Sequence, residues 1–383
     1  MPKHIVFSNN DLIRLRLQNQ HLSITQFDQA DEVVRWMGAV QAQDFAAAKW
    51  AVGQRTKVPN DAKVEQEFAD GKILRTHVMR PTWHFVAPED IRWLLKLTAP
   101  RVNAASAYQY RRLELDSAVF KRSHAIIEKA LRDGKQLTRE ELGTKLKKAD
   151  IPAIDLRLTY VVMRAELDGA ICSGARRGKQ FTYALLDERI PKSKILTRDE
   201  SLAELATRYF KSHGPATLQD FVWWSGLTTA DAKAGLEMVK HQFVHESVGD
   251  QTYWFSEPKS TEKEISLSVY LLSNYDEYIV GYTDRSAIYD TSHIEKLDSR
   301  SNPLFMHTIA INGEIAGTWK RTIKARKVEI EFNPFRLLAK EEKQLLNMTA
   351  ERYGKFLNLE VATLIIQRAI KVRQQSRIHT VMR

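Results

Sequence analysis

The sequence lacks the features that mark several common classes of protein. Cys172 is the single cysteine among 383 residues, which excludes an intramolecular disulfide, a CxxC motif and a thiolate metal site. No stretch approaches the ~20 apolar residues of a membrane-spanning helix. The first residues, MPKHIVFSNNDLIR, lack the apolar core of a signal peptide. We therefore expect a soluble, cytoplasmic protein without a structural zinc ion.

Acidic residues are in the minority. The chain has 47 Asp and Glu against 58 Lys and Arg, which gives a formal net charge of +11 and a pI near 9.5. Such an excess favours a polyanionic partner, with nucleic acid as the first candidate and a membrane surface as the second. With 43% hydrophobic residues, the chain is long enough for two to four compact units.

One pattern occurs twice in the middle of the chain. In QLTREELGTKL, Thr138 and Glu141 form a capping box that begins a helix; DLRLTYVVMRAEL predicts a second helix, and GAICSGARRGKQFTYALL predicts a hairpin. The pattern returns 79 residues later, with Thr217 and Asp220 in the same two places and TTADAKAGLEMVK and FVHESVGDQTYWF after them. Helix, turn, helix and hairpin is the order of a winged helix.

A third, more divergent copy lies upstream. DEVVRWMGAVQAQDFAAAKWAVGQR predicts two helical runs interrupted at two glutamines, and KILRTHVMRPTWHFV predicts a hairpin that turns at Arg80-Pro81. We therefore expect three tandem winged helices. They occupy residues 1–120, 121–195 and 196–258, which we call the first, second and third units.

The composition changes after residue 258. SLSVYLLSN, YIVGYT, HTIAINGEIAGTWKR and KVEIEFN are strand-like, and Asn312-Gly313 predicts a tight hairpin turn. An amphipathic helix follows from Lys340. We predict an α+β protein in which the three units are followed by a small β-barrel with a C-terminal helix over residues 259–383.

Basic residues gather where a winged helix would contact DNA. Arg176, Arg177 and Lys179 lie on the second predicted hairpin. A second cluster in the predicted barrel consists of Lys320, Arg321, Lys324, Arg326 and Lys327. Charge runs are also common on solvated faces, and winged helices also bind proteins, but both clusters agree with the net charge. The adjacent Trp319 is a candidate for contact with DNA, whereas the other tryptophans fit a core role.

Two histidines lie in the first predicted hairpin. His77 and His84 are seven residues apart, on opposite faces of a straight strand, so they do not form a metal pair. For His84 two roles remain open: it faces a phosphate or the reaction centre, or it is a hydrogen-bonded structural histidine. Arg75 completes the candidate DNA contacts in this hairpin.

Four stretches of the chain together resemble one known family. VQAQDF, RTHVMRPTWHFV, YDEYIVGYTDRS and INGEIAGTWKR are similar to the AlkZ-like winged-helix DNA glycosylases, the azinomycin-resistance glycosylase and YcaQ relatives. The resemblance implies that the winged helices and barrel form a C-shaped clamp around DNA. It also implies that a Gln-φ-Gln motif, here Gln41-Ala42-Gln43, carries catalysis without a cofactor or metal. The implied substrates are N7-alkylated purines in double-stranded DNA, with interstrand crosslinks as further candidates.

The implied reaction suits two neutral amides. A purine alkylated at N7 is already cationic, so it leaves without the carboxylic acid that glycoside hydrolysis ordinarily needs. The enzyme then has only to orient a water and stabilise an oxocarbenium-like sugar. Residues at i and i+2 of an extended segment point to one side, which would let Gln41 and Gln43 share one water. The alternative is that both side chains cap the preceding helix.

Acidic residues near these motifs have another interpretation. Asp44 follows the glutamines and should face away from them. Asp276, Glu277 and Asp284 lack a third ligand or a lysine at a spacing that would support a metal nuclease. We interpret them as a structural link between the barrel and the units, through Arg285 or a neighbouring basic residue.

A second function class remains, a winged-helix regulator that binds DNA without catalysis. Regulators of this kind usually bind as symmetric dimers on half-sites about one helical turn apart. Three unlike copies without zipper heptads favour a monomer. We therefore predict a monofunctional, monomeric DNA glycosylase with no membrane partner.

Overall fold

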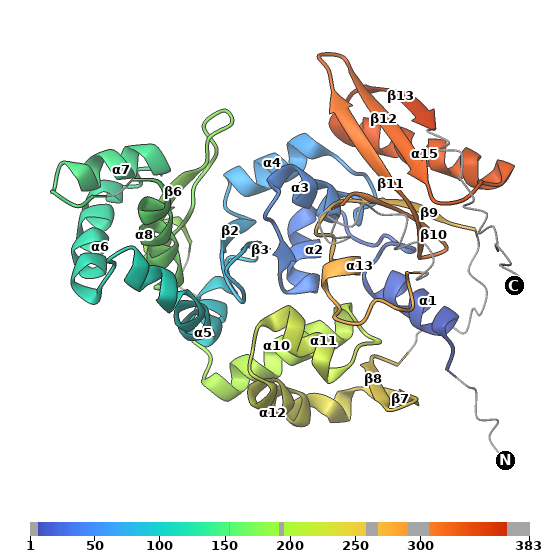
Figure 1. Ribbon diagram of the computed structural model, residues 1–383, viewed down its shortest axis with the longest axis horizontal. Coiled ribbons are helices and arrows are strands. Elements are labelled where there is room, and N and C mark those ends of the chain that lie inside the picture. Colours follow the sequence, from blue (N-terminus) through green and yellow to red (C-terminus); the bar gives the residue numbers. More distant parts are fainter. Residues whose placement is uncertain (1–6, 153, 191–194, 258–266, 290–305, 366–383) are drawn as a thin grey trace, which may run out of the picture.

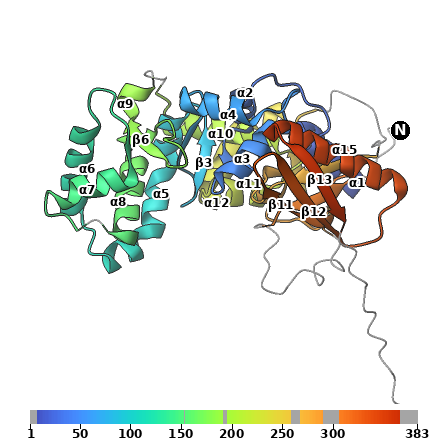
Figure 2. The same ribbon diagram turned by 90° about the horizontal axis from the view of Figure 1, so that it is seen from above.

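The computed structural model describes residues 7–152, 154–190, 195–257, 267–289 and 306–365. It is a mixed α+β protein, as predicted, with helices and short hairpins up to residue 257 and a five-stranded sheet after it. Figures 1 and 2 place most of the second unit at one end of the molecule and this sheet at the other. Within the described chain, no helix is both long and apolar enough to cross a membrane.

The first unit breaks its helices at the glutamines, as predicted. Gly38 ends one helix with a φ of +79°, which glycine adopts readily. Asp44 begins the next by accepting a hydrogen bond from the Ala47 N–H. The elements are α1 (Asn9–Asn19), α2 (Ala30–Met37), β1 (Val40–Gln41), α3 (Phe45–Gly53), α4 (Asp61–Ala69), β2 (Leu74–His77), β3 (Trp83–Val86) and α5 (Ile91–Arg112). The three strands form one antiparallel sheet in the order β1-β3-β2.

The two predicted capping boxes are confirmed at Thr138 and Thr217. The second unit contains α6 (Ser117–Leu131), β4 (Leu137–Thr138), α7 (Arg139–Lys147), α8 (Asp155–Leu167), β5 (Ile171–Ser173), β6 (Thr182–Leu185) and α9 (Leu186–Arg189). The third contains α10 (Arg198–Ser212), α11 (Leu218–Ser225), α12 (Thr229–Val239), the 3-10 helix η1 (Lys240–Gln242), β7 (Val244–Val248) and β8 (Gln251–Phe255). Helix α6 runs across residue 120, where the sequence placed the first boundary. The motifs gave no sign of α5, α6 and α10.

The C-terminal sheet is curled but open (Figure 1). Its strand order is β13-β12-β11-β10-β9, so β9 and β13 are edges and the predicted barrel is not closed in the described chain. The elements are β9 (Val269–Leu272), α13 (Glu277–Val280), β10 (Thr308–Ile311), β11 (Glu314–Ile323), β12 (Lys327–Pro334), α15 (Lys340–Leu357) and β13 (Glu360–Ile365). The turn at Asn312-Gly313 and the helix from Lys340 are confirmed.

One predicted strand is wrong. YIVGYT contributes to the short helix α13, because the Asp276 carboxylate accepts a hydrogen bond from the Tyr278 N–H and begins a helical turn. All four residues of α13 are buried. An all-round apolar stretch of this length fits either a buried strand or a buried helix, and periodicity alone does not separate them.

Two apolar cores meet at the glutamine segment. One joins α5 to the second and third units, and the other joins α2, α3 and α4 to the C-terminal sheet and α15. Trp50 of α3 shows how tight the second core is: its indole N–H donates to the Leu271 carbonyl at 2.6 Å, and its ring lies 4.9 Å from that of Tyr353. The segment between α2 and α3 is therefore fixed from both sides.

Candidate active site around the paired glutamines

The backbone of the glutamine segment is held in an extended form. Gln41 pairs with His84 across β1 and β3, and the Ala42 N–H donates to the Trp83 carbonyl at 2.7 Å. On its other side the Gln41 N–H donates to Glu277 Oε1 at 2.7 Å. Gln41 is buried, whereas Gln43 is exposed. The segment is anchored through its main chain, which leaves both amide side chains available.

Both amide oxygens accept hydrogen bonds from the same hairpin. Gln41 Oε1 accepts from Arg80 Nη2 at 3.0 Å, and Gln43 Oε1 accepts from the Trp83 N–H at 3.4 Å. An amide oxygen has two acceptor positions, so each can accept one more hydrogen bond. In the described chain neither side chain bonds to a helix carbonyl, and α2 ends instead with a bond from the Gly38 N–H to the Val34 carbonyl. The helix-capping alternative is therefore not supported.

Arg75 ties the glutamine segment to the first hairpin. Its Nε donates to the Ala42 carbonyl at 2.9 Å, and its Nη2 lies 3.5 Å from the Gln43 carbonyl. The guanidinium stacks 4.3 Å from the Trp83 ring centre and 4.5 Å from that of Phe181. Burial lowers the pKa of Arg75 to about 10, so the side chain stays charged at neutral pH. Arg75 is buried rather than on the surface, where a DNA contact was predicted, and it holds the Gln41-Ala42-Gln43 segment in place.

His84 lies inside the site and has no exposed surface. Burial, assisted by the Arg80 charge, lowers its pKa to about 3, so it is neutral at physiological pH. Nδ1 lies 3.0 Å from the Thr82 carbonyl and must carry the hydrogen, which leaves the buried Nε2 as an acceptor without a partner in the described chain. A phosphate contact by His84 is excluded by this burial, and a place at the reaction centre agrees with it.

A buried carboxylate lies behind the motif. Glu277 accepts the Gln41 N–H, accepts the Trp224 indole N–H at 2.9 Å and lies 3.4 Å from His213 Nε2. Burial alone would raise the pKa of Glu277, but these hydrogen bonds and charges outweigh it and hold the pKa below its usual value. A negative charge is thus fixed within hydrogen-bonding distance of the Gln41 backbone.

Of the two other acids that the sequence assigns to a link between the barrel and the units, Asp276 makes such a link and Asp284 has a local contact instead. Asp276 forms a buried ion pair with Arg55, with Nη2 and Oδ1 2.8 Å apart. Arg285, the suggested partner, instead donates to the Ile279 carbonyl at 2.8 Å. Asp284 accepts the N–H of Ser286. No cluster of three or more His, Cys, Asp or Glu side chains suited to a metal ion occurs among the described residues.

Comparison with known proteins places this geometry in a family. The family model described as "DNA glycosylase AlkZ-like" matches residues 34–356. The chain belongs to the AlkZ-like DNA glycosylase family. An "interstrand DNA cross-link repair glycosylase" of Streptomyces sahachiroi is 25% identical over 329 residues, covering 80% of this chain and 85% of that protein. The solved structure of the Streptomyces sahachiroi DNA glycosylase AlkZ matches with a TM-score of 0.76 at 21% identity, over 94% of this chain and all of that one.

The second hairpin of this AlkZ-like protein presents only part of its predicted basic surface. Arg176 is half-buried, with Nη1 3.0 Å from Glu65 Oε2 and its guanidinium 4.9 Å from the Phe45 ring centre. Arg177 is exposed and pairs with Glu141 at 2.8 Å. Lys179 is exposed and has no ion pair within the described chain. Arg177 and Lys179 remain candidate DNA contacts, whereas Arg176 joins the second unit to the first.

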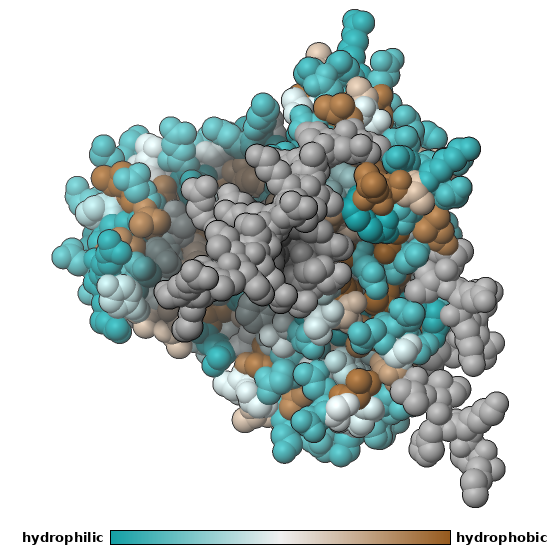
Figure 3. Space-filling view, turned by 45° about the vertical axis from the view of Figure 1, so that its right-hand side comes forward, coloured by the Kyte–Doolittle hydropathy of each residue, from teal (hydrophilic) through white to brown (hydrophobic). Residues whose placement is uncertain are grey.

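The β11–β12 hairpin carries the other predicted cluster. Trp319 is 2% exposed, and its indole N–H donates to the Leu272 carbonyl at 2.9 Å, so the expected contact of this ring with DNA is excluded by burial. Arg321 bonds to the Tyr353 hydroxyl, whereas Lys320 is exposed. Figure 3 shows hydrophilic side chains over the projection at its top, which is this hairpin. Alternation along β11 turns Trp319 inward and Lys320 outward.

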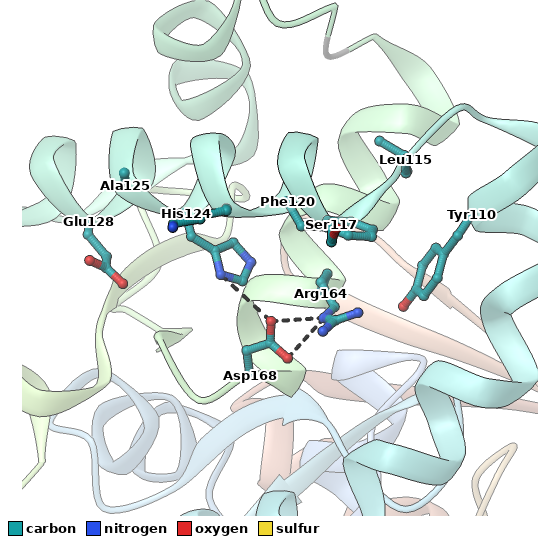
Figure 4. Close-up of a pocket in the computed structure, with 10 residues that line it drawn as sticks. Tyr110, Leu115, Ser117, Phe120, His124, Ala125, Glu128, Arg164 and Asp168 are labelled. Carbon is teal, nitrogen blue, oxygen red and sulfur yellow. Dashed lines mark hydrogen bonds and ion pairs between the residues drawn. The ribbon is translucent and has the colours of Figure 1, made fainter.

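A separate hollow of about 610 Å³ lies in the second unit (Figure 4). In it His124 Nδ1 lies 3.7 Å from Asp168 Oδ2. Both carboxylate oxygens of Asp168 accept hydrogen bonds from Arg164 Nε. Burial lowers the pKa of His124. The residues that line this hollow lie between 110 and 168, and within the described chain none hydrogen-bonds to either glutamine. We therefore do not assign the AlkZ-like chemistry to it.

Sequence motifs missed the residues that support the glutamines from a distance. The sequence named Arg80 only as part of a hairpin turn and Glu277 only as part of a structural link, and it did not connect His213 and Trp224 of the third unit to the site. One signal was present: Glu277 stands between apolar and aromatic residues in YDEYIV, and an acid in such a run is rarely buried without a partner.

Proposed function

We propose that this chain is a monofunctional DNA glycosylase that hydrolyses the N-glycosidic bond of N7-alkylated purines in double-stranded DNA. Gln41 and Gln43 are the proposed catalytic residues. The observation that carries the proposal is that both amide oxygens point to one hairpin from an anchored, extended segment, with an acceptor position left on each. The name of the Streptomyces sahachiroi relative, an interstrand DNA cross-link repair glycosylase, extends the proposed substrates to interstrand crosslinks.

In the proposed mechanism a water held by the two amide oxygens adds to C1′ of the sugar. The electron pair of the breaking C1′–N bond goes to the purine, which thereby loses its positive charge. The water oxygen bonds to C1′ and loses its proton to bulk water, which reaches the site at the exposed Gln43. The positive charge that develops on the sugar is stabilised by the amide dipoles and by the ionised Glu277 behind Gln41, because charges act strongly across a buried, water-poor region.

We further propose that the three units act as winged helices and, with the C-terminal sheet, form a C-shaped clamp on DNA as a monomer in the cytoplasm. Exposed cations on the second hairpin and on β11 would neutralise phosphates, with Arg177, Lys179 and Lys320 as the proposed contacts. Binding of this kind weakens linearly on a log scale, by roughly 0.9 in log K per phosphate contact for each tenfold rise in salt.

A single-turnover assay tests the proposal. The protein is incubated with a duplex that contains one 7-methylguanine, and abasic sites are then cleaved with alkali. We expect strand cleavage with the wild-type protein and none with the Gln41→Ala, Gln43→Ala double variant at unchanged melting temperature. A regulator without catalysis would bind the duplex and release no base, and wild-type activity in the double variant would end the assignment to the glutamines.

A further inference from the structure

A hollow of about 390 Å³ lies beside the glutamine motif, between the first hairpin and the second unit. Two of its lining residues, Arg75 and Trp83, are the residues that bond to Gln43 through its carbonyl and its side chain. The opposite wall comes from β6 and the residues before it, with Phe181 and Tyr183. The hollow therefore adjoins the one proposed catalytic side chain that is exposed.

Three of the residues that line this hollow are aromatic: Trp83, Phe181 and Tyr183. Arg75 lies between the rings of Trp83 and Phe181, so a guanidinium and two aromatic faces form one stack. At about 390 Å³, the hollow is large enough to hold a two-ring base with its substituent. Stacking on such faces is the sequence-tolerant way in which proteins hold nucleobases.

Two polar groups in the lining of the hollow, the Tyr183 hydroxyl and the Trp83 indole N–H, are available to a ligand. Tyr183 is 7% exposed, and burial raises the pKa of its hydroxyl, which is therefore neutral. Within the described chain neither this hydroxyl nor the indole N–H of the partly exposed Trp83 takes part in a hydrogen bond, although a buried tyrosine hydroxyl usually has a partner. A purine offers ring nitrogens and exocyclic groups that would satisfy both.

The positive charge around the hollow favours a neutral base over a cationic one. Arg75 stays charged, and Lys179 and Arg139 add two exposed cations against the single acid Glu140. A cationic N7-alkylated purine is disfavoured here and a neutral one is not. Positive charge moves from base to sugar as the bond breaks, so cations beside the base and the Glu277 anion beyond Gln41 both favour cleavage.

We infer that this hollow receives the alkylated purine base as it leaves, with Tyr183 and the Trp83–Arg75–Phe181 stack as its binding surface. The inference rests on the proposed glycosylase function and adds to it a site for the leaving group. Arg75 has two tasks in it: it holds the motif through the Ala42 carbonyl and raises the energy of a charged base relative to a neutral one.

Ligand-detected NMR with DNA-free protein tests the site. We expect saturable binding of 7-methylguanine, a weaker complex by about 3- to 10-fold in Tyr183→Phe, since one neutral hydrogen bond is lost, and no change in the matched control Tyr110→Phe in the other hollow. At about pH 6 the cation 7,9-dimethylguanine, which has the same ring with a fixed charge, should bind more weakly than 7-methylguanine.

Excision kinetics separate this inference from the proposed function. Tyr183→Phe should slow single-turnover excision of 7-methylguanine several-fold and leave affinity for undamaged duplex unchanged. Excision by the wild type without saturable binding of the free base, or equal binding by both tyrosine variants, overturns the site and leaves the glycosylase standing. Tighter binding of the cation overturns the charge argument. Absence of excision by the wild type overturns both.

Discussion

The second and third units share one local pattern and differ in what surrounds it. Their capping boxes lie 79 residues apart. In the second unit the side chain of the capping acid Glu141 is 41% exposed and pairs with Arg177 on its own hairpin. In the third the equivalent Asp220 has no exposed surface, accepts the Thr283 N–H at 2.8 Å and lies 3.8 Å from Arg16. The same motif thus begins a helix within its own unit in one case and also holds distant segments together in the other.

The hairpins of the second and third units also differ, in the charge that they carry. Residues 176–179 of the second hairpin contain three cations, whereas VHESVGDQTYWF of the third contains Glu246 and Asp250 and neither lysine nor arginine. In the third unit, Trp224 and His213 instead contact the Glu277 carboxylate, behind the glutamines. In the proposed function, one copy therefore offers a surface to DNA and a wall to the leaving base, and the other supports the proposed reaction centre.

Removal of the charge that the third unit supports should have the largest effect. In Glu277→Gln an acceptor for the Gln41 N–H remains but the negative charge is lost, so we expect excision to fall by about 10²- to 10³-fold while DNA affinity holds. Single-turnover rates beside a thermal melt measure this. Wild-type rates in a folded Glu277→Gln protein would show that the third unit supports the site by packing alone.

The exposed glutamine comes next. Gln43→Ala should lose excision of N7-alkylguanine by about 10²-fold, the scale for one positioned polar group, with DNA affinity and melting temperature nearly unchanged. Gln43→Asp should keep activity on small cationic adducts, because a carboxylate also stabilises the sugar cation. A stable but inactive Gln43→Asp would restrict the role to a group that needs the amide.

The buried histidine makes stability depend on pH. His84 has a pKa of about 3 in the folded protein and about 6.5 when unfolded. Below pH 6.5 His84 binds a proton in the unfolded chain but not in the folded chain. The free energy of unfolding therefore falls as the pH falls, by about 2 kcal/mol at pH 5 from this group. Denaturant unfolding at pH 7 and pH 5 should show a smaller difference in His84→Gln. Equal differences in both proteins would contradict the burial of this ring.

The basic second hairpin should have a smaller, sequence-independent effect. Arg177→Ala with Lys179→Ala should weaken binding to any duplex by about 10-fold at low salt and reduce the salt slope by roughly 0.9 per lost contact. Lys240→Ala in the third unit, which removes an exposed cation that pairs with Glu237, is the control and should change little. A larger loss from the control would reverse the roles of the two units.

The capping boxes give the smallest and most direct comparison. Thr217→Ala leaves the buried Asp220 N–H without its acceptor, so we expect a loss of about 1–2 kcal/mol in unfolding free energy. Thr138→Ala should cost about 0.5–1 kcal/mol, because water can replace the hydroxyl near the exposed Glu141. Denaturant unfolding measures both. Equal losses would show that the surroundings of the two boxes do not matter.

Local signals made much of the helical part predictable from the sequence. A capping box needs residues only three positions apart, so Thr138 and Thr217 marked true helix starts, and the break at the glutamines was readable in the same way. Side-chain direction was less accessible: Trp319 seemed a surface residue because cations follow it, yet alternation along β11 turns it into the core. The prediction of a strand at YIVGYT was wrong because a fully buried apolar stretch shows neither the two-residue period of a strand nor the 3.6-residue period of a helix.

The candidate site was predictable only where the family motif named it. Arg75 was expected on the surface because a positive charge usually lies there, but its stack with two rings and its bond to the Ala42 carbonyl depend on residues from two units. The anchor at Glu277 joins residues 236 positions apart. No local pattern encodes such a contact, since it exists only after the sheet has packed on the first unit.

That long-range anchor also affects the order in which a newly made chain gains its abilities. Residues 41 and 43 leave the ribosome early, and the basic second hairpin follows, but Glu277 emerges only after nearly three-quarters of the chain. Domains generally fold from the N-terminus during synthesis. An unfinished or prematurely terminated chain would therefore carry the proposed DNA-binding cations before the proposed catalytic segment is fixed in place. If these proposals hold, strand-weakening abasic sites would be produced only by completed molecules.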